Sequence, residues 1–383
     1  MQRLVDERIL AGVSSAVLVA GEVADLHCVG WADREREVAL APHHLFRVFS
    51  NTKLVTSCAA LLLMEEGRFG LDDPIGEYLP QLANLRVLRP GATRLDDTEP
   101  ARGPVTIRQL LSHSAGLGNG LLDPGSLLYE AYARAGVRDP NRTLEQMVQS
   151  LSGLPLLFHP GTGWEYSMAT DVVGRLVEVL GGESLDRHFR RRIFEPLGMH
   201  DTAFEVPADR HADLVAYYAG ASVADPWQPG LSRTDDAPYP GAYLRPFARQ
   251  AAGGGLVSSL PDMIALVKSL RPGGEALLRP ETLSLLATNQ LAPGVRVRFP
   301  GVSPTPGKGF GLAGAVTLQP SPEDPPQSRG DVEWGGIAGT HWWISPANDL
   351  AGIVMAQRQW AFWHPFALLL KRHACEGALQ VAP

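Results

Sequence analysis

The segment FSNTKLVTSCAALLLMEEG, residues 49–67, decides the fold of this chain. From Lys53 onward its apolar residues recur at helical spacing and a glycine ends the run, which predicts a helix buried on several faces. Ser50 is expected at the N-terminal end of that helix. Because residues three apart share a helix face, the Ser50 hydroxyl and the Lys53 amine can meet there.

Serine and lysine at this spacing are typical of nucleophilic catalysis. A serine hydroxyl needs a neighbour to take its proton, and a lysine partly removed from water can do so. The amides at a helix N-terminus would favour the charge of an oxyanion. The alternative is a helix-capping serine followed by a solvated lysine, a common arrangement. Ser50-x-x-Lys53 is, however, the only S-x-x-K in the chain.

The composition is that of a globular protein with room for a deep cleft. The chain has 383 residues, of which 45% are hydrophobic and 20% charged. This length predicts either one large domain with a sizeable insertion or two domains that share a site. The net charge of −7 is spread along the chain without a Lys/Arg block. We therefore expect a small-molecule substrate rather than nucleic acid or an anionic membrane surface.

Cysteine usage and the N-terminus indicate a cytoplasmic protein. Cys28, Cys58 and Cys375 are odd in number and far apart, so they predict neither a disulfide framework nor a metal or redox pair. The N-terminus lacks a basic region followed by a long apolar one, and no apolar stretch approaches about 20 residues. The adjacent His43 and His44 lack the spacing of a metal site, so we expect no metal and no other cofactor.

The order of patterns along the chain predicts a sheet at both ends and helices between them. Residues 13–31 read as a hairpin and residues 365–373 as a last helix. The segments 90–103 and 318–330 are rich in Pro, Asp and Arg and are expected to be surface loops. Further helices are expected at 106–113, 144–151, 169–180 and 185–193, and further strands at 256–259, 309–318, 340–345 and 349–357.

Several segments resemble the class C β-lactamase-related superfamily of serine hydrolases. Besides the S-x-x-K they are TIRQLLSHSAGL (106–117), FHPGTGWEYS (158–167), IFEPLGM (193–199) and GGGLVSS (253–259). The resemblance implies an α/β fold in which an antiparallel sheet is flanked by helices. It also implies an α/β domain of residues 1–75 and 250–383, and an inserted helical domain of residues 76–249 with loops over the cleft.

Within the superfamily, the closest resemblance is to family VIII carboxylesterases. It rests on Tyr166-Ser167-Met168 and on WGGIAGT at 334–340. Lactamases usually carry Tyr-x-Asn, whose amide holds the substrate, whereas Met168 offers no such group. They also usually carry Lys-Thr-Gly where Trp334 stands here without a charge. Both departures favour a neutral ester over a β-lactam.

The resemblance also implies a role for each site residue. Ser50 is the expected nucleophile, and Lys53 or Tyr166 the base, a choice that the sequence leaves open. The expected oxyanion hole is made of the backbone N–H groups of Ser50 and Ile337. Simpler readings are a Tyr166 that caps a helix start and a Trp334 that only packs. The residues expected to bind substrate are Met168, Trp334, Gly335 and Gly336.

These observations predict a serine carboxylesterase that cleaves esters of small, mostly uncharged acids. The alternatives are a β-lactamase or D-peptidase, an acyltransferase with the same residues, and a non-catalytic binding protein. A countercharge for an anionic substrate could come from Arg245 or Arg249.

His113 next to Ser114 resembles a triad histidine, but the segment lacks the first glycine of a nucleophile elbow. Loops near 118–135 and 205–250 should set the cleft size.

Overall fold

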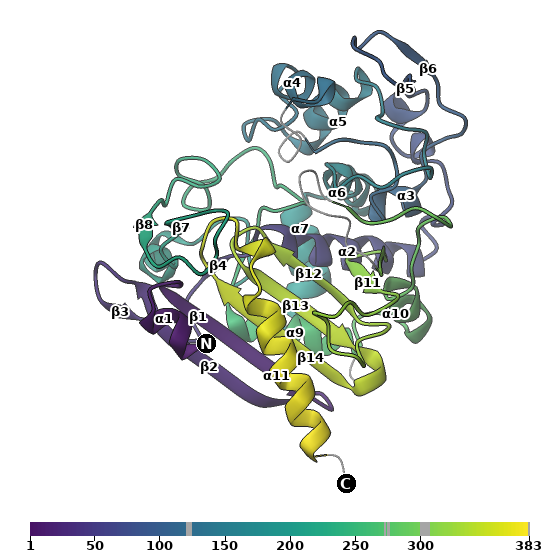
Figure 1. Ribbon diagram of the computed structural model, residues 1–383. Helices are drawn as coiled ribbons and strands as arrows, with labels where there is room; N and C mark the ends of the chain where they lie inside the picture. Colours follow the sequence, from purple (N-terminus) through teal and green to yellow (C-terminus); the bar gives the residue numbers. More distant parts are fainter. Residues whose placement is uncertain (120–124, 272, 274–275, 299–306, 382–383) are drawn as a thin grey trace.

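The computed structural model describes residues 1–119, 125–271, 273, 276–298 and 307–381. Its main feature is an eight-stranded antiparallel sheet in the order β10-β11-β12-β13-β14-β1-β2-β3. Strands from both ends of the chain form this sheet, with β14 beside β1 (Figure 1). The strands are β1 (Gly12–Val19), β2 (Glu22–Asp33), β3 (Val38–Ala39), β10 (Lys308–Phe310), β11 (Ala315–Thr317), β12 (Val332–Gly336), β13 (Thr340–Ser345) and β14 (Leu350–Ala356).

The predicted N-terminal hairpin is present as β1 and β2. Its two-residue turn consists of Ala20 (φ 49°) and Gly21 (φ 85°), the left-handed pair that a tight hairpin requires. On the other side of β1, Val13 pairs with Ala356 and Val19 with Leu350 of β14. Every residue of β14 is buried, because helices cover both faces of the sheet at this point.

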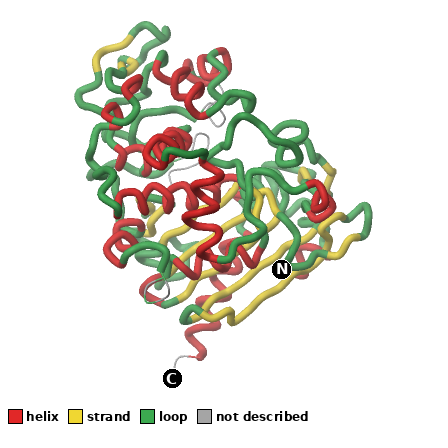
Figure 2. The backbone as a smooth tube through the Cα atoms, turned by 180° about the vertical axis from the view of Figure 1, so that it is seen from behind, coloured by secondary structure: helices red, strands yellow, loops and turns green. Residues whose placement is uncertain are grey.

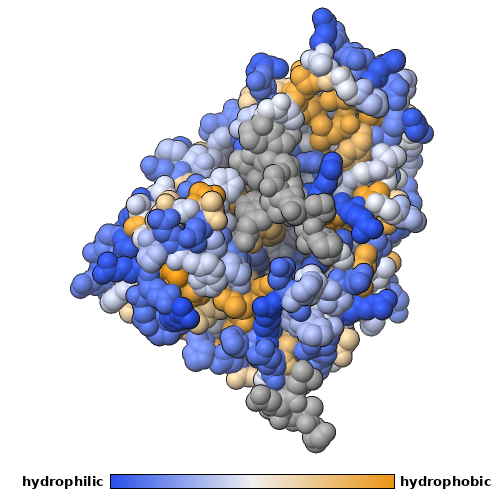
Figure 3. Space-filling view, viewed as in Figure 1, coloured by the Kyte–Doolittle hydropathy of each residue, from blue (hydrophilic) through white to orange (hydrophobic). Residues whose placement is uncertain are grey.

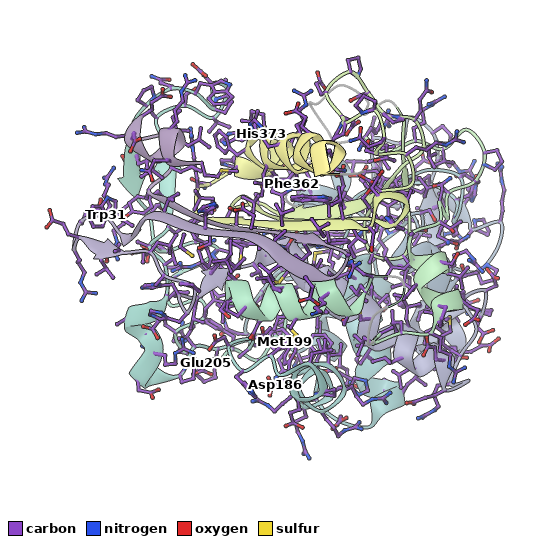
Figure 4. All side chains as sticks on the ribbon, turned by 90° about the horizontal axis from the view of Figure 1, so that it is seen from below. Trp31, Asp186, Met199, Glu205, Phe362 and His373 are labelled. Carbon is purple, nitrogen blue, oxygen red and sulfur yellow. The ribbon has the colours of Figure 1, made fainter. Side chains whose placement is uncertain are left out.

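The sheet lies between α11 (Phe366–Val381) on one face and α9 (Leu260–Ser269) on the other (Figure 4). Phe362, just before α11, lies between that helix and the sheet. Helix α2 (Thr52–Glu65) is buried over most of its length and packs against α6 (Ala169–Gly181). Burial on several faces explains why the sequence of α2 is apolar all round rather than amphipathic.

Helices α3 (Ile107–Leu111), α4 (Leu127–Arg134) and α5 (Leu144–Ser152) lie above the sheet, at one end of the molecule (Figures 1 and 2). Thr106 with Gln109 and Thr143 with Gln146 form capping boxes that fix the starts of α3 and α5. Further helices are α1 (Gln2–Asp6), α7 (Leu185–Phe189), α8 (Glu195–Leu197) and α10 (Pro280–Leu286). The predicted domain boundaries remain a prediction.

The structure refines several expected elements. Ser50 lies in a 3-10 turn, Phe49–Asn51, directly before α2. The expected strand at 309–318 is a hairpin of two strands, because Gly311 and Gly314 turn the chain between β10 and β11. The segment 90–103, expected to be a loop, includes β6 (Thr98–Pro100), which pairs with β5 (Arg86–Leu88). Two further pairs are β4 (Phe46–Arg47) with β9 (Val257–Ser258) and β7 (Tyr218–Gly220) with β8 (Leu231–Arg233).

The surface is mixed in character. Polar residues cover most of the face shown in Figure 3, and apolar side chains gather among the helices in its upper part. Among the described helices, none combines the length and the apolar character needed to cross a bilayer. Residues 120–124, in one of the loops expected to set the cleft size, lie outside the described residues.

Candidate active site

Ser50 is held by a strained turn at the start of α2. The preceding Phe49 has a φ of 43°, a left-handed conformation that is unfavourable for a bulky residue. Neighbouring bonds fix this turn, because the carbonyl oxygen of Val48 accepts from the Thr340 hydroxyl at 3.1 Å and from the Asn51 N–H at 3.0 Å. In this turn, Ser50 lines the cavity described below.

Lys53 lies one helical turn further along, as the S-x-x-K spacing predicts. Its Nζ donates to the Gly253 carbonyl oxygen at 2.6 Å and to Ser50 Oγ at 3.4 Å. The side chain is 7% exposed, so both contacts are made largely away from water. Residues 252–256 bind the same helix, since Thr56 donates to the Ala252 carbonyl and Thr52 accepts from the Leu256 N–H.

Tyr166 contacts the same hydroxyl. Its Oη donates to Ser50 Oγ at 2.7 Å, and Lys53 Nζ lies 4.7 Å from the centre of its ring. The indole N–H of Trp334 donates to Tyr166 Oη at 3.4 Å. A phenol and an amine therefore both contact the one serine hydroxyl, as required for a group that takes its proton.

The end of β12 packs directly against the segment that precedes Ser50. A Cβ at Gly336 would lie 2.4 Å from the Val48 carbonyl oxygen, so only glycine permits this approach. The next residue, Ile337, borders the cavity together with Ser50. In the described part of the chain, no hydrogen bond uses the Ile337 N–H. The backbone at Ile337 is thus close to the serine and has a donor to offer.

A cavity of about 460 Å³ opens beside these groups. Seven of the eight predicted site residues line it, namely Ser50, Lys53, Tyr166, Met168, Trp334, Gly335 and Ile337. Gly336 is not among the described lining residues, and its contact is with Val48 instead. Eight aromatic residues also line it: Phe49, Phe204, Tyr217, Tyr239, Tyr243, Phe247, Trp360 and Phe362.

Arg245 and Arg249, the two arginines named as possible countercharges, both line the cavity. Arg249 is 8% exposed and donates to the carbonyl oxygens of Val137 and Arg142. The Arg245 guanidinium lies 4.3 Å from the centre of the Phe247 ring. The protein therefore engages Arg245 through an aromatic face and Arg249 through backbone, although Nη2 of Arg249 is buried with no hydrogen-bond partner among the described residues.

Asp171 is a cavity residue that the sequence did not single out. It lies in the first turn of α6 and is buried, and its Oδ1 accepts from the Gly253 N–H at 3.3 Å. Burial raises the pKa of this carboxyl group, while Arg249 and Lys53 act in the opposite direction. Nothing in the sequence distinguishes it from an ordinary solvated aspartate at a helix start.

His113 and Ser114 do not form a second site. His113 is buried, and its Nδ1 accepts from the Ser167 N–H at 3.3 Å. Burial, with a further contribution from Lys53, lowers the pKa of His113 well below its usual value. Ser114 Oγ is 2.9 Å from Ser112 Oγ, and neither His113 nor Ser114 is among the described residues that line the cavity. The described residues also contain no group of three or more His, Cys, Asp or Glu able to hold a metal ion.

Fold and site together define a serine hydrolase with the fold of β-lactamases and penicillin-binding proteins. The chain belongs to the Beta-lactamase family, whose model matches residues 1–362.

Named relatives include esterases. Esterase EstB of Burkholderia gladioli is 32% identical over 364 residues, which cover 91% of this chain and 86% of that protein. Lovastatin esterase of Penicillium rubens is 32% identical over 79% of this chain and 77% of its own. The solved structure of EstCE1, described as a hydrolase with promiscuous acyltransferase activity, superposes with a TM-score of 0.82 at 28% identity, covering 97% of this chain and 95% of its own. The resemblance to family VIII carboxylesterases is thereby confirmed.

Proposed function

We propose that the protein is a carboxylic ester hydrolase that works through an acyl-enzyme on Ser50. The observation that carries this proposal is the contact of Tyr166 Oη with Ser50 Oγ at 2.7 Å, with Lys53 Nζ at 3.4 Å from the same oxygen. The esterase relatives support it.

The reaction takes two steps. Ser50 Oγ attacks the ester carbonyl while its proton passes to the Lys53/Tyr166 pair, and the N–H groups of Ser50 and Ile337 bind the oxyanion. The alcohol leaves with that proton, and Ser50 keeps the acyl group. The same pair then takes a proton from water, whose oxygen attacks the acyl carbon, and returns it to Ser50 as the acid departs.

The cavity wall favours uncharged substrates. Met168 and Trp334 bring no charge to the positions where lactamases usually carry polar groups. Of the three arginines that line the cavity, Arg138, Arg245 and Arg249, Arg245 is engaged by Phe247, and Arg249 donates through Nε and Nη1 to backbone carbonyls. A carboxylate that enters without a free cationic partner loses hydration at a cost of about 1–3 kcal/mol, or roughly 10- to 150-fold in rate. Esters of small, mostly uncharged acids are therefore the proposed substrates.

A panel of p-nitrophenyl esters of increasing acyl length, run beside nitrocefin, tests this proposal. We expect the short neutral esters to exceed nitrocefin in kcat/KM by at least about tenfold. A fluorophosphonate should add once, on the peptide that carries Ser50. Equal turnover of nitrocefin and p-nitrophenyl butyrate would replace the esterase with a β-lactamase, and labelling elsewhere would move the nucleophile.

Acyl transfer is a second candidate. The volume of about 460 Å³ leaves room for an acceptor beside a short acyl group, and EstCE1 is described as having such an activity. Hydrolysis of p-nitrophenyl butyrate in the presence of a competing alcohol separates the two, because a transferase forms the new ester in preference to the acid. Free acid as the dominant product would exclude transfer as the main activity.

A further inference from the structure

Lys53 and Asp171 lie on two sides of one glycine. A Cβ at Gly253 would be 2.6 Å from Asp171 Oδ2 and 3.3 Å from Lys53 Nζ. The carboxylate and the ammonium are therefore both close to the same point, within the range of roughly 4–6 Å over which opposite charges stabilise each other. Glycine at this position is what leaves room for the two groups.

The Gly253 backbone also connects the two side chains by hydrogen bonds. Its N–H donates to Asp171 Oδ1 at 3.3 Å, and its carbonyl oxygen accepts from Lys53 Nζ at 2.6 Å. Asp171 is 4% exposed and belongs to the first turn of α6, where the helix N-terminus favours a negative charge. A rigid helix thus orients the backbone that in turn orients the lysine.

We propose that Asp171 is a positioning residue of this site, which through Gly253 fixes Lys53 beside Ser50 in its ammonium form. The inference rests on the proposed function, since it concerns the proton that the Lys53/Tyr166 pair exchanges with Ser50. With the ammonium held in this way, the proton of the pair resides on Lys53, and Tyr166 is the group that accepts the proton of Ser50.

Other charged and titratable groups face this cluster. Arg249, Arg138 and His113 approach from the segments packed around α6, and Tyr166 lies on the cavity side. Burial raises the pKa of Asp171, and Arg249 and Lys53 offset only part of that rise. His113 is kept neutral by burial. Asp171 is therefore the acidic group of the cluster that can balance Lys53.

The variant Asp171→Asn separates charge from shape, because the amide oxygen can still accept from the Gly253 N–H. In the active form the Lys53/Tyr166 pair has lost one proton, and the carboxylate opposes that loss. Its removal should move the acid limb of the kcat/KM profile to lower pH by about one unit. It should also lower the plateau by about 10- to 100-fold, since the proton then rests on Tyr166.

Asp262→Asn is the matched control. Asp262 is also a buried aspartate in the first turn of a helix, and it accepts from the Asp201 N–H at 2.8 Å, but it belongs to α9 and is not among the cavity residues. We expect this variant to lose stability and to keep the wild-type pH profile. An unchanged acid limb in Asp171→Asn, or the same shift in both variants, overturns the proposal.

A second measurement does not depend on the variant folding or on ester turnover. With only four lysines in the chain, ¹⁵N-lysine labelling allows the Nζ resonance of Lys53 to be followed, with Lys53→Arg as the assignment control. In the wild type it should stay at the ammonium position from about pH 6 to about pH 9. Titration within this range would overturn the proposal. A wild type that neither hydrolyses esters nor binds fluorophosphonate at Ser50 would contradict the proposed function alone.

Discussion

Two buried lysine clusters lie on opposite faces of β12, and they differ in how the charge is met. On one face, Lys371 Nζ lies 2.8 Å from Asp331 and 2.7 Å from Glu333, and Lys308 is 2.8 Å from Glu333. On the other face, Lys53 contacts the Gly253 carbonyl and the Ser50 hydroxyl. Successive residues of a strand point to opposite faces, so Glu333 and Trp334 bring β12 into both clusters.

The two clusters differ in role: the charges of Lys371, Lys308 and Glu333 hold parts of the fold together, whereas the charge of Lys53 lies at the candidate active site. Burial would raise the pKa of Glu333, but Lys371 and Lys308 hold it well below its usual range. Burial would likewise lower the pKa of Lys371, but Glu333 and Asp331 hold it above its usual value. Charges satisfied in this way join α11 to the sheet and have no proton to exchange near neutral pH. Lys53, in contrast, contacts the Ser50 hydroxyl, so its charge lies beside the oxygen whose proton is exchanged.

The largest expected effect comes from Ser50→Ala. Removal of the nucleophile should lower the ester kcat by at least about 10⁴-fold, as found for serine nucleophiles in general. The melting temperature should change little, because one hydroxyl is lost at a cavity wall. Substantial ester turnover in this variant would place the nucleophile elsewhere.

The next largest effect concerns the proton-transfer pair. Lys53→Ala and Tyr166→Phe should each lower kcat by about 10²- to 10⁴-fold. Combined, they should cost far less than the product of the two, because groups that act as one unit are not additive. Steady-state kinetics of the single and double variants measure this coupling, and fully multiplying losses would contradict a shared proton.

A variant on the other face of β12 should change stability instead of rate. Glu333→Gln leaves Lys371 and Lys308 short of a buried partner and should lower the free energy of unfolding by about 3–5 kcal/mol. The folded fraction should keep its kcat/KM within about twofold, since Glu333 points away from the cavity. Urea unfolding together with ester kinetics checks both statements. A large loss of kcat in the folded variant would mean that the two clusters are coupled.

Acid should lower the stability of the protein through protonation of His341. Burial lowers its pKa to about 4, so the unfolded chain takes up the proton first as the pH falls. The free energy of unfolding should therefore decrease between about pH 6.5 and about pH 4, by up to about 3 kcal/mol from this group. Urea unfolding at several pH values should give a flatter profile for His341→Gln. Equal slopes in the two proteins would remove His341 as the cause.

Much of this site could be predicted from local sequence. Lys53 follows Ser50 by one helical turn, so its contact is written into the spacing. Tyr166 was reached only through the resemblance, because nothing local connects it with a serine 116 positions away. The sequence does not predict a role for Asp171, because its burial depends on how α6 packs over residues 252–253. It does not predict the strained conformation of Phe49 for a similar reason, since Thr340 on a distant strand helps to fix its turn.

The smallest effect on kcat should come from a change of Trp334, which lies on the face of β12 that borders the cavity. Its indole N–H is 3.4 Å from Tyr166 Oη, a long bond that gains strength as charge builds up on the phenol oxygen. Trp334→Phe keeps an aromatic ring in the wall and removes this donor, so kcat should fall by about 3- to 10-fold with little change in KM. Trp342→Phe is the control, since Trp342 pairs with Trp334 across the strands and is not among the described cavity residues. It should lose stability and keep kcat. Equal kcat in the two variants would mean that Trp334 only packs against the cavity wall and does not act on the tyrosine.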